Sequence, residues 1–137
     1  MTFVLDASIA LGWCFEDETS RYSDAVLDSL TSSAGLVPVL WPLEIANGLL
    51  VCERRGRLAP GKSTQFFGML RKLPLRVETS VDMAAVEKLL SLGRDYRLTS
   101  YDALYLGLAM KENCPLATAD KNLKRACRKA GVELFKP

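Results

Sequence analysis

Short apolar runs alternate with amphipathic segments along the whole chain. A strand, a helix and a second parallel strand form a right-handed crossover unit, and successive units of this kind build a parallel sheet covered by helices. The sequence therefore predicts an α/β fold with a doubly wound, mostly parallel sheet flanked by helices. The runs expected to form strands are Thr2–Leu5, Leu36–Leu40, Leu75–Glu78, Leu116–Ala119 and Val132–Phe135.

The segments between these runs carry the signals of helix starts and ends. Ser, Thr or Asp residues precede several of them, as at helix N-caps, and Gly131 suits the end of the last one. The expected helices are Ala7–Trp13, Ser20–Leu30, Pro42–Arg57, Pro60–Leu73, Val81–Arg94, Ser100–Glu112 and Lys121–Ala130. With no internal repeat and no linker, residues 1–137 are expected to form one domain.

Composition argues against a zinc site and a membrane anchor. The four cysteines are scattered without a C-x-x-C pair, and no histidine is present to complete a zinc tetrad. The most apolar stretch, residues 36–51, is interrupted by two prolines and Glu44, and the chain opens without a basic, signal-like segment. We therefore expect reduced thiols, no membrane span and a cytoplasmic protein.

Charge is unevenly distributed, although the net charge is only +2. Residues 1–50 contain one basic and seven acidic residues, whereas residues 51–137 contain seventeen basic and nine acidic residues. An acidic cluster in one part of the chain and a basic majority in the other suit a protein that binds a polyanion around a metal ion.

Four acidic residues are expected to meet at the carboxyl edge of the predicted sheet. Asp6 and Asp120 each follow an apolar run directly, and they become neighbours if their strands pair. Glu44 and Asp102 are expected in the first turns of helices that begin at the same edge. Ligands of open parallel sheets bind beyond the carboxyl ends of the strands, at a topological switch point, so this edge is the predicted site.

Each of these acids, taken singly, could serve only as a helix cap, worth about 0.3 to 1 kcal/mol. Four carboxylates in one cleft, however, repel one another and raise their own pKa values, and a divalent cation removes that conflict. Oxygen ligands without histidine favour Mg²⁺ or Mn²⁺ over zinc. Because histidine, the usual general base, is missing, cleavage of a phosphodiester would need a metal-activated water.

The order and spacing of the segments around these acids resemble those of a known family. The segments are Val4–Ser8, Pro42–Asn47, Ser100–Ala109 and Leu116–Leu123. They are similar to the four motifs of PIN-domain nucleases, specifically the VapC toxins of bacterial toxin and antitoxin pairs. One such motif is weak evidence, but four in the right order are specific, and the resemblance spans essentially the whole chain.

The resemblance implies a Mg²⁺- or Mn²⁺-dependent endoribonuclease that acts on RNA, forms a homodimer and is neutralised by a cognate VapB antitoxin. The family's acidic quartet is matched by Asp6, Glu44, Asp102 and Asp120. Asp6 and Asp102 are the first choices as direct metal ligands, and the other two would complete the shell or orient the attacking water. Ser8 and Thr118 match auxiliary hydroxyls that would fix carboxylate rotamers. Asn122 is a weaker candidate for that role, with an ordinary first-turn position as an equal alternative.

Further side chains are candidates for binding surfaces. Basic residues recur at helical spacing after Asp120 and could either bind phosphates or face solvent; they are Lys121, Lys124, Arg125, Arg128 and Lys129. The chain has more large apolar side chains than one buried helix face requires. They could belong to the core or could line a groove for an antitoxin segment. These residues are Trp13, Trp41, Phe66, Phe67, Met69, Leu70 and Tyr105. The acidic run at residues 16–18 is expected to be a solvated loop, and a basic turn contains Arg54, Arg55, Arg57 and Lys62.

Several other functions compete with this interpretation. A phosphatase of the haloacid dehalogenase type needs a second Asp two residues after the first, and that position is Ser8. A receiver-like signalling module needs a phosphoacceptor Asp after the third strand, where the chain has Thr79 and Ser80. A PIN fold that binds RNA or a partner without cutting, and a structure-specific DNA nuclease, both remain open alternatives.

Overall fold

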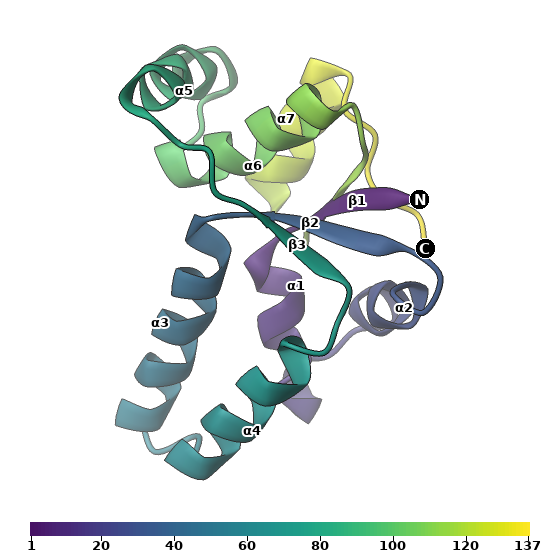
Figure 1. The fold of residues 1–137 in the computed structure, drawn as a ribbon, viewed down its shortest axis with the longest axis vertical. Coiled ribbons are helices and arrows are strands. Elements are labelled where there is room, and N and C mark those ends of the chain that lie inside the picture. Colours follow the sequence, from purple (N-terminus) through teal and green to yellow (C-terminus); the bar gives the residue numbers. More distant parts are fainter.

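Four parallel strands in the order β3-β2-β1-β4 form the centre of the molecule, and seven α-helices flank them (Figure 1). The computed structural model describes residues 1–137. The strands are β1 (Thr2–Leu5), β2 (Ala34–Pro38), β3 (Leu75–Glu78) and β4 (Leu116–Ala117). The helices are α1 (Ala7–Gly12), the 3₁₀ helix η1 (Glu16–Glu18), α2 (Arg21–Ser29), α3 (Leu40–Arg54), α4 (Pro60–Leu70), α5 (Met83–Tyr96), α6 (Ser100–Glu112) and α7 (Lys121–Ala130).

The strand order changes direction beside β1. The chain moves outward from β1 to β2 and β3, and then returns to place β4 on the free side of β1. In Figure 1, α5, α6 and α7 lie above the strands, whereas α1 and the pair formed by α3 and α4 lie below them. The predicted doubly wound parallel sheet is therefore confirmed, with its switch point between the carboxyl ends of β1 and β4.

Burial follows the position of each strand in the sheet. The side chains of Phe3, Val4 and Leu5 in β1 are inaccessible to solvent, and so are Leu36 and Val37 in β2. Both strands are covered by helices on their two faces, which explains why they are continuous apolar runs rather than alternating ones. The edge strand β3 contains no fully buried residue, so the core is centred on β1 and β2.

Several predicted boundaries differ from the observed ones. The second strand ends at Pro38 rather than at Leu40, because Val39 already has helical dihedral angles and α3 starts two residues before Pro42. Pro42 still lies in the first turn, where no intrahelical N–H is needed. The helix ends at Arg54 rather than Arg57, just before Gly56 takes a left-handed conformation with φ of 71°.

The predicted last strand at residues 132–135 is wrong as an extended element. Only one parallel bridge forms there, between Leu116 and Leu134. The backbone makes two hydrogen bonds with β4 in this region, from Leu116 N to Glu133 O and from Phe135 N to Leu116 O, each 2.9 Å long. Because β4 itself is only two residues long, no longer ladder forms, and the C-terminal segment is also held by the bond from Val132 N to Cys127 O and by the Tyr22 hydroxyl on Phe135 O.

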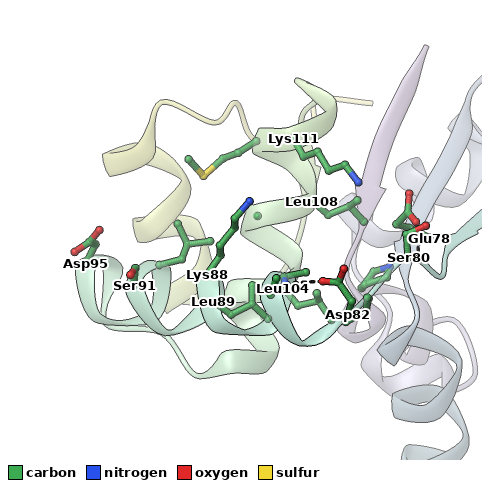
Figure 2. A pocket seen from close by; sticks show the side chains of 17 residues that line it. Glu78, Ser80, Asp82, Lys88, Leu89, Ser91, Asp95, Leu104, Leu108 and Lys111 are labelled. Atoms are coloured by element: carbon green, nitrogen blue, oxygen red, sulfur yellow. Dashed lines mark hydrogen bonds between the residues drawn. The ribbon is translucent and has the colours of Figure 1, made fainter.

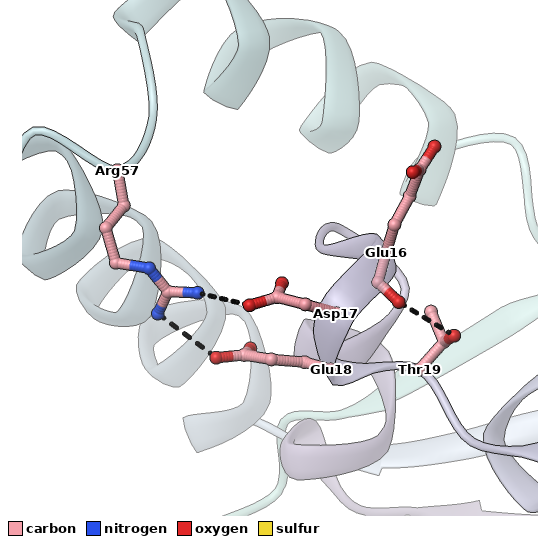
Figure 3. A network of polar contacts seen from close by, with 5 residues as sticks. All are labelled: Glu16, Asp17, Glu18, Thr19 and Arg57. Carbon is pink, nitrogen blue, oxygen red and sulfur yellow. Dashed lines mark hydrogen bonds and ion pairs between the residues drawn. The ribbon is translucent and has the colours of Figure 1, made fainter.

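The acidic run at residues 16–18 is exposed, as expected from the sequence, but it is a short helix and not a loop. It forms η1, and Arg57 from the turn after α3 binds two of its carboxylates (Figure 3). Arg57 Nη1 lies 3.1 Å from Glu18 Oε1, and Nη2 lies 3.5 Å from Asp17 Oδ2. The guanidinium also lies over the Phe15 ring, 4.8 Å from its centroid. These exposed contacts fasten the segment between α1 and α2 to the turn between α3 and α4.

The structure describes the state of the cysteines and the character of the helices, about which the composition led to expectations. All four cysteines are free thiols. None of the helices combines the length and the apolar character needed to traverse a bilayer.

The stacked rings of Phe3 and Phe135 hold the C-terminal segment against β1. Their centroids are 3.9 Å apart with an interplanar angle of 10°, and Phe135 is only 4% exposed. We expect Phe135→Ala to lower the free energy of unfolding by about 3 kcal/mol, because it leaves a cavity beside the central strand. Urea denaturation measures this change, and Met83→Ala, at a position 85% exposed, should change stability little. Equal effects of the two substitutions would show that the stacked pair contributes nothing.

Candidate functional site

The pairing of β1 with β4 sets the position of Asp6. Val4 and Leu5 are in register with Leu116 and Ala117, and Asp6 N donates to Ala117 O at 2.9 Å. The Asp6 side chain is only 6% exposed, and its Oδ2 accepts hydrogen bonds from Thr118 Oγ1 at 2.6 Å and Ser8 Oγ at 2.8 Å. The structure thus places both hydroxyls named from the sequence on one oxygen of Asp6, with Oδ1 making no hydrogen bond.

Asp120 lies beside this group at the start of α7. Its backbone N–H donates to Thr118 Oγ1 at 3.0 Å, so that one hydroxyl contacts both segments. Its side-chain Oδ1 accepts from Leu123 N at 2.8 Å, as expected for an N-cap residue. The helix-cap interpretation is therefore correct for Asp120, although its Oδ2 remains without a hydrogen bond.

Asp102 has no capping role. The N-cap of α6 is Thr99, whose Oγ1 accepts from Asp102 N at 3.2 Å. The half-buried carboxylate of Asp102 makes no hydrogen bond and lies in the first helical turn, as predicted. Asp6 likewise occupies the N-cap position of α1 without a side-chain cap bond. Capping therefore does not account for the placement of these two acids.

Glu44 differs from its predicted position by one turn. Because α3 begins at Leu40, Glu44 lies in the second turn rather than the first, and its carboxylate is half-buried. Its Oε1 accepts a hydrogen bond of 2.7 Å from the hydroxyl of Tyr105 in α6. That hydroxyl also accepts from Ala7 N at 3.3 Å. Sequence reasoning considered Tyr105 only as core or groove, although its spacing of three residues from Asp102 places both on one helix face.

The carboxylates influence one another electrostatically. Burial raises the pKa of Asp102 to about 6, and the charges of Asp120 and Asp6 add to this rise. Burial also raises the pKa of Glu44; the hydrogen bond from Tyr105 opposes the rise, and the charges of Asp6 and Asp102 reinforce it. All four acids predicted from the sequence therefore belong to one interacting set at the carboxyl edge of the sheet.

The donor set fits a hard cation. Each carboxylate keeps at least one oxygen that makes no hydrogen bond, and the conflict among like charges would be relieved by a positive ion. Oxygen donors without histidine or thiolate suit Mg²⁺ or Mn²⁺. No three of these side chains are arranged closely enough to hold one ion between them. The acids are thus a converging set and not a finished coordination shell.

The family model of the PIN domain matches residues 3–129, which is nearly the whole chain. The chain belongs to the PIN-domain family. PIN domains are generally nucleases and generally use divalent metal ions. Among curated proteins, none matches this chain.

Three solved structures share the PIN fold of this chain at low sequence identity. PAE2754 from Pyrobaculum aerophilum is 17% identical with a TM-score of 0.72, over 92% of this chain and 84% of that chain. VapBC2 from Rickettsia felis, bound to a DNA fragment from their promoter, is 14% identical with a TM-score of 0.70, over 98% of each chain. FitAcB from Neisseria gonorrhoeae is 17% identical with a TM-score of 0.66, over 100% of this chain and 98% of that chain.

The basic side chains of α7 divide into two groups. Arg125 Nη2 donates to Tyr96 O at 3.1 Å, and Lys129 Nζ donates to Asp95 O at 3.4 Å, so these two connect α7 to the end of α5. The others make no ion pair and are Lys121, Lys124 and Arg128. Asn122 is exposed and makes no hydrogen bond with the carboxylates. All five predicted basic side chains nevertheless remain at least partly exposed at the surface of the PIN domain.

The cavity shown in Figure 2 is separate from this site. It has a volume of about 580 Å³ and lies between α5, α6 and the end of β3. Leu89 of α5 and Leu104 and Leu108 of α6 line it, with Lys88 and Lys111 at its polar border, and none of the four predicted site acids takes part. Helix α5, which forms one side of the cavity, contains no buried residue.

The electrostatic conflict predicts the behaviour of Asp102→Asn in EDTA. Because the folded-state pKa of Asp102 is raised, its ionisation costs stability above about pH 6, and that cost disappears as the pH falls through about 6 towards the ordinary value of 3.8. The variant lacks this charge, so at pH 7.5 we expect it to melt no lower than the wild type, with the difference shrinking by pH 5. Thermal unfolding followed by circular dichroism measures both, with Asp28→Asn on the exposed face of α2 as the control. A clear loss of stability would indicate a structural role for Asp102.

Proposed function

We propose that this PIN-domain protein is a VapC-type toxin, a Mg²⁺- or Mn²⁺-dependent endoribonuclease that acts in the cytoplasm and hydrolyses RNA phosphodiester bonds. The observation that carries the proposal is the convergence of Asp6, Glu44, Asp102 and Asp120 at the switch point between β1 and β4. Two of these acids have no capping role in the fold, and each has an oxygen available for a cation. A purely structural function does not explain that arrangement.

We assign a separate role in metal binding to each of these residues. Asp6 and Asp102 are the proposed direct ligands, and Glu44 and Asp120 complete the shell or orient the attacking water. Thr118 and Ser8 hold Oδ2 of Asp6 at 2.6 and 2.8 Å, which leaves Oδ1 oriented for the ion. When bound, the ion supplies a water of lowered pKa and stabilises negative charge on the phosphate.

RNA is the proposed polyanion. Lys121, Lys124 and Arg128 follow Asp120 on α7 and provide exposed or half-buried positive charge near the acids. The proposal of RNA over structure-specific DNA rests on the resemblance of the four acidic motifs to those of VapC toxins, because positive charge on α7 does not itself select the sugar.

Incubation of the purified protein with total RNA and Mn²⁺ tests the activity. We expect cleavage at defined sites, loss of cleavage in EDTA, and a fall of more than about 100-fold in Asp6→Ala, because that substitution removes a ligand together with the partners of Thr118 and Ser8. Mapping the cut ends identifies the sites. Asp28→Ala, which removes an exposed acid from α2, is the matched control and should keep full activity. Equal cleavage by Asp6→Ala and the wild type would contradict the proposal, and cleavage of structured DNA alone would replace RNA as the substrate.

We further propose that a VapB-type antitoxin occupies the groove between α3 and α4. The groove has a volume of about 490 Å³ and is lined by Leu49 and Leu50 of α3 and by Phe67 of α4, with Arg71 at its border. Phe66, Leu70 and Trp41, which the sequence also left open between core and groove, belong to the core. The lining is therefore apolar with a charged rim, as suits an amphipathic partner segment.

A second copy of this chain is the proposed partner of α5. Met83, Val86 and Leu90 form an exposed apolar stripe on this helix, and the exposed Val77 lies on the adjacent edge strand β3. Small proteins seldom leave such a stripe uncovered, and an edge strand with exposed apolar residues is also commonly protected. A homodimer across α5 and β3 would bury both.

Substitution within the stripe tests the homodimer. We expect Leu90→Glu to convert the dimer to a monomer, because it places a charge at the centre of the apolar contact. Light scattering coupled to size exclusion measures the mass in solution. Leu43→Glu makes the same chemical change at an exposed position of α3 and should leave the dimer intact. A monomeric wild type, or a dimer that tolerates Leu90→Glu, would contradict the assignment of this surface.

A further inference from the structure

Tyr105 has a buried hydroxyl at the centre of the acidic site. The residue is only 1% exposed, and its ring lies within the core. Its hydroxyl donates to Glu44 Oε1 at 2.7 Å and accepts from Ala7 N at 3.3 Å. One atom therefore connects the start of α1, the second turn of α3 and the inner face of α6, three segments that are far apart in sequence.

The direction of these two hydrogen bonds is fixed by chemistry. A backbone N–H can only donate, so the Tyr105 oxygen must be the acceptor from Ala7 and its own proton remains for Glu44. Ala7 is the first residue of α1, and its N–H has no intrahelical acceptor. The hydroxyl thus satisfies a helix-end donor and at the same time holds one oxygen of Glu44, leaving Oε2 without a hydrogen bond.

The placement of Tyr105 on α6 ties it to the proposed metal ligands. Asp102 and Tyr105 are three residues apart and lie on the same side of the helix. Helix α6 therefore supplies both Asp102 and the Tyr105 hydroxyl that binds Glu44. Asp6 has an equivalent arrangement, since Thr118 and Ser8 hold its Oδ2 and leave Oδ1 free.

We propose that Tyr105 is a positioning residue of the metal site, which holds Glu44 beside Asp6 and Asp102 through its hydroxyl. This inference rests on the proposed metal-dependent function. A phenylalanine would fill the same buried volume, so core packing alone does not call for the hydroxyl. A buried hydroxyl is costly unless it is hydrogen-bonded, and here both of its bonds go to the edge where the acids meet.

Tyr22 is the control for the loss of a tyrosine hydroxyl elsewhere in the fold. This half-buried residue donates its hydroxyl to Phe135 O at 2.8 Å, so Tyr22→Phe removes one hydrogen bond where Tyr105→Phe removes two. That bond ends on a backbone carbonyl of the C-terminal segment and touches none of the four acids. If Tyr105→Phe weakens metal binding and Tyr22→Phe does not, the effect comes from the contact of Tyr105 with the acidic site and not from the general loss of a tyrosine hydroxyl.

Mn²⁺ binding without RNA tests the proposal, with free Mn²⁺ measured by electron paramagnetic resonance. We expect Tyr105→Phe to weaken Mn²⁺ binding by about tenfold or more, as for other groups that orient metal ligands. Tyr22→Phe should bind as the wild type does. Thermal unfolding in EDTA, measured in parallel, shows whether each variant is folded. Equal affinities of Tyr105→Phe and the wild type would overturn the positioning role while leaving the proposed function intact.

A double-mutant cycle with Glu44→Ala separates positioning from packing. If Tyr105 acts through Glu44, adding Tyr105→Phe to Glu44→Ala should cause no further loss of Mn²⁺ affinity. A further loss as large as in the wild-type background would overturn the proposal. A wild type that binds no Mn²⁺ would instead remove the proposed function itself.

Discussion

The parallel pairing of β1 with β4 is the contact on which the site depends. It returns the chain from the far edge of the sheet to the free side of β1, and it places Thr118 directly beside Asp6. The hydrogen bond from Asp6 N to Ala117 O fixes the backbone at the point where the two segments separate. With β1 inaccessible to solvent, this edge cannot shift without disturbing the core, so Asp6 is anchored to the most deeply buried strand of the molecule.

The carboxylates at this edge of the sheet lower the stability of the fold, although they are the groups proposed to bind the metal ion. Carboxylates that are partly buried and close together raise the pKa values of Asp102 and Glu44, which means that the fold tolerates a local electrostatic cost. Hydroxyls compensate for part of it, because Thr118, Ser8 and Tyr105 donate to the acids without adding charge. Such local conflicts, offset by packing elsewhere, cluster at functional sites.

Packing is uneven across the rest of the molecule. The helices beside β1 and β2 contribute residues to one continuous core, whereas α5 contains no buried residue and the edge strand β3 is largely open. The cavity between α5 and α6 and the apolar stripe on α5 have the same origin, namely a helix that this chain alone does not cover. The groove between α3 and α4 is a second partly apolar surface, on the other side of the sheet. The two surfaces proposed for partner binding thus lie away from the buried strands that carry Asp6 and Thr118.

The sequence by itself determined the alternating pattern and the parallel sheet, and it named the four candidate acids, because each of these depends on local order: an apolar run, its length and the residue that follows it. Asp6 and Asp120 could be named since each directly follows a predicted strand, whereas Ser8 and Thr118 were named only from the resemblance to PIN-domain motifs. Tertiary structure decided what depends on distant segments. The hydrogen bond between Tyr105 and Glu44 joins residues 61 positions apart. The hydrogen bond from Arg57 to Glu18 of η1 joins residues 39 positions apart. Neither contact leaves a local signal in the sequence. The strand expected at residues 132–135 does not form because the adjacent strand β4 is only two residues long and offers too few backbone groups for a ladder.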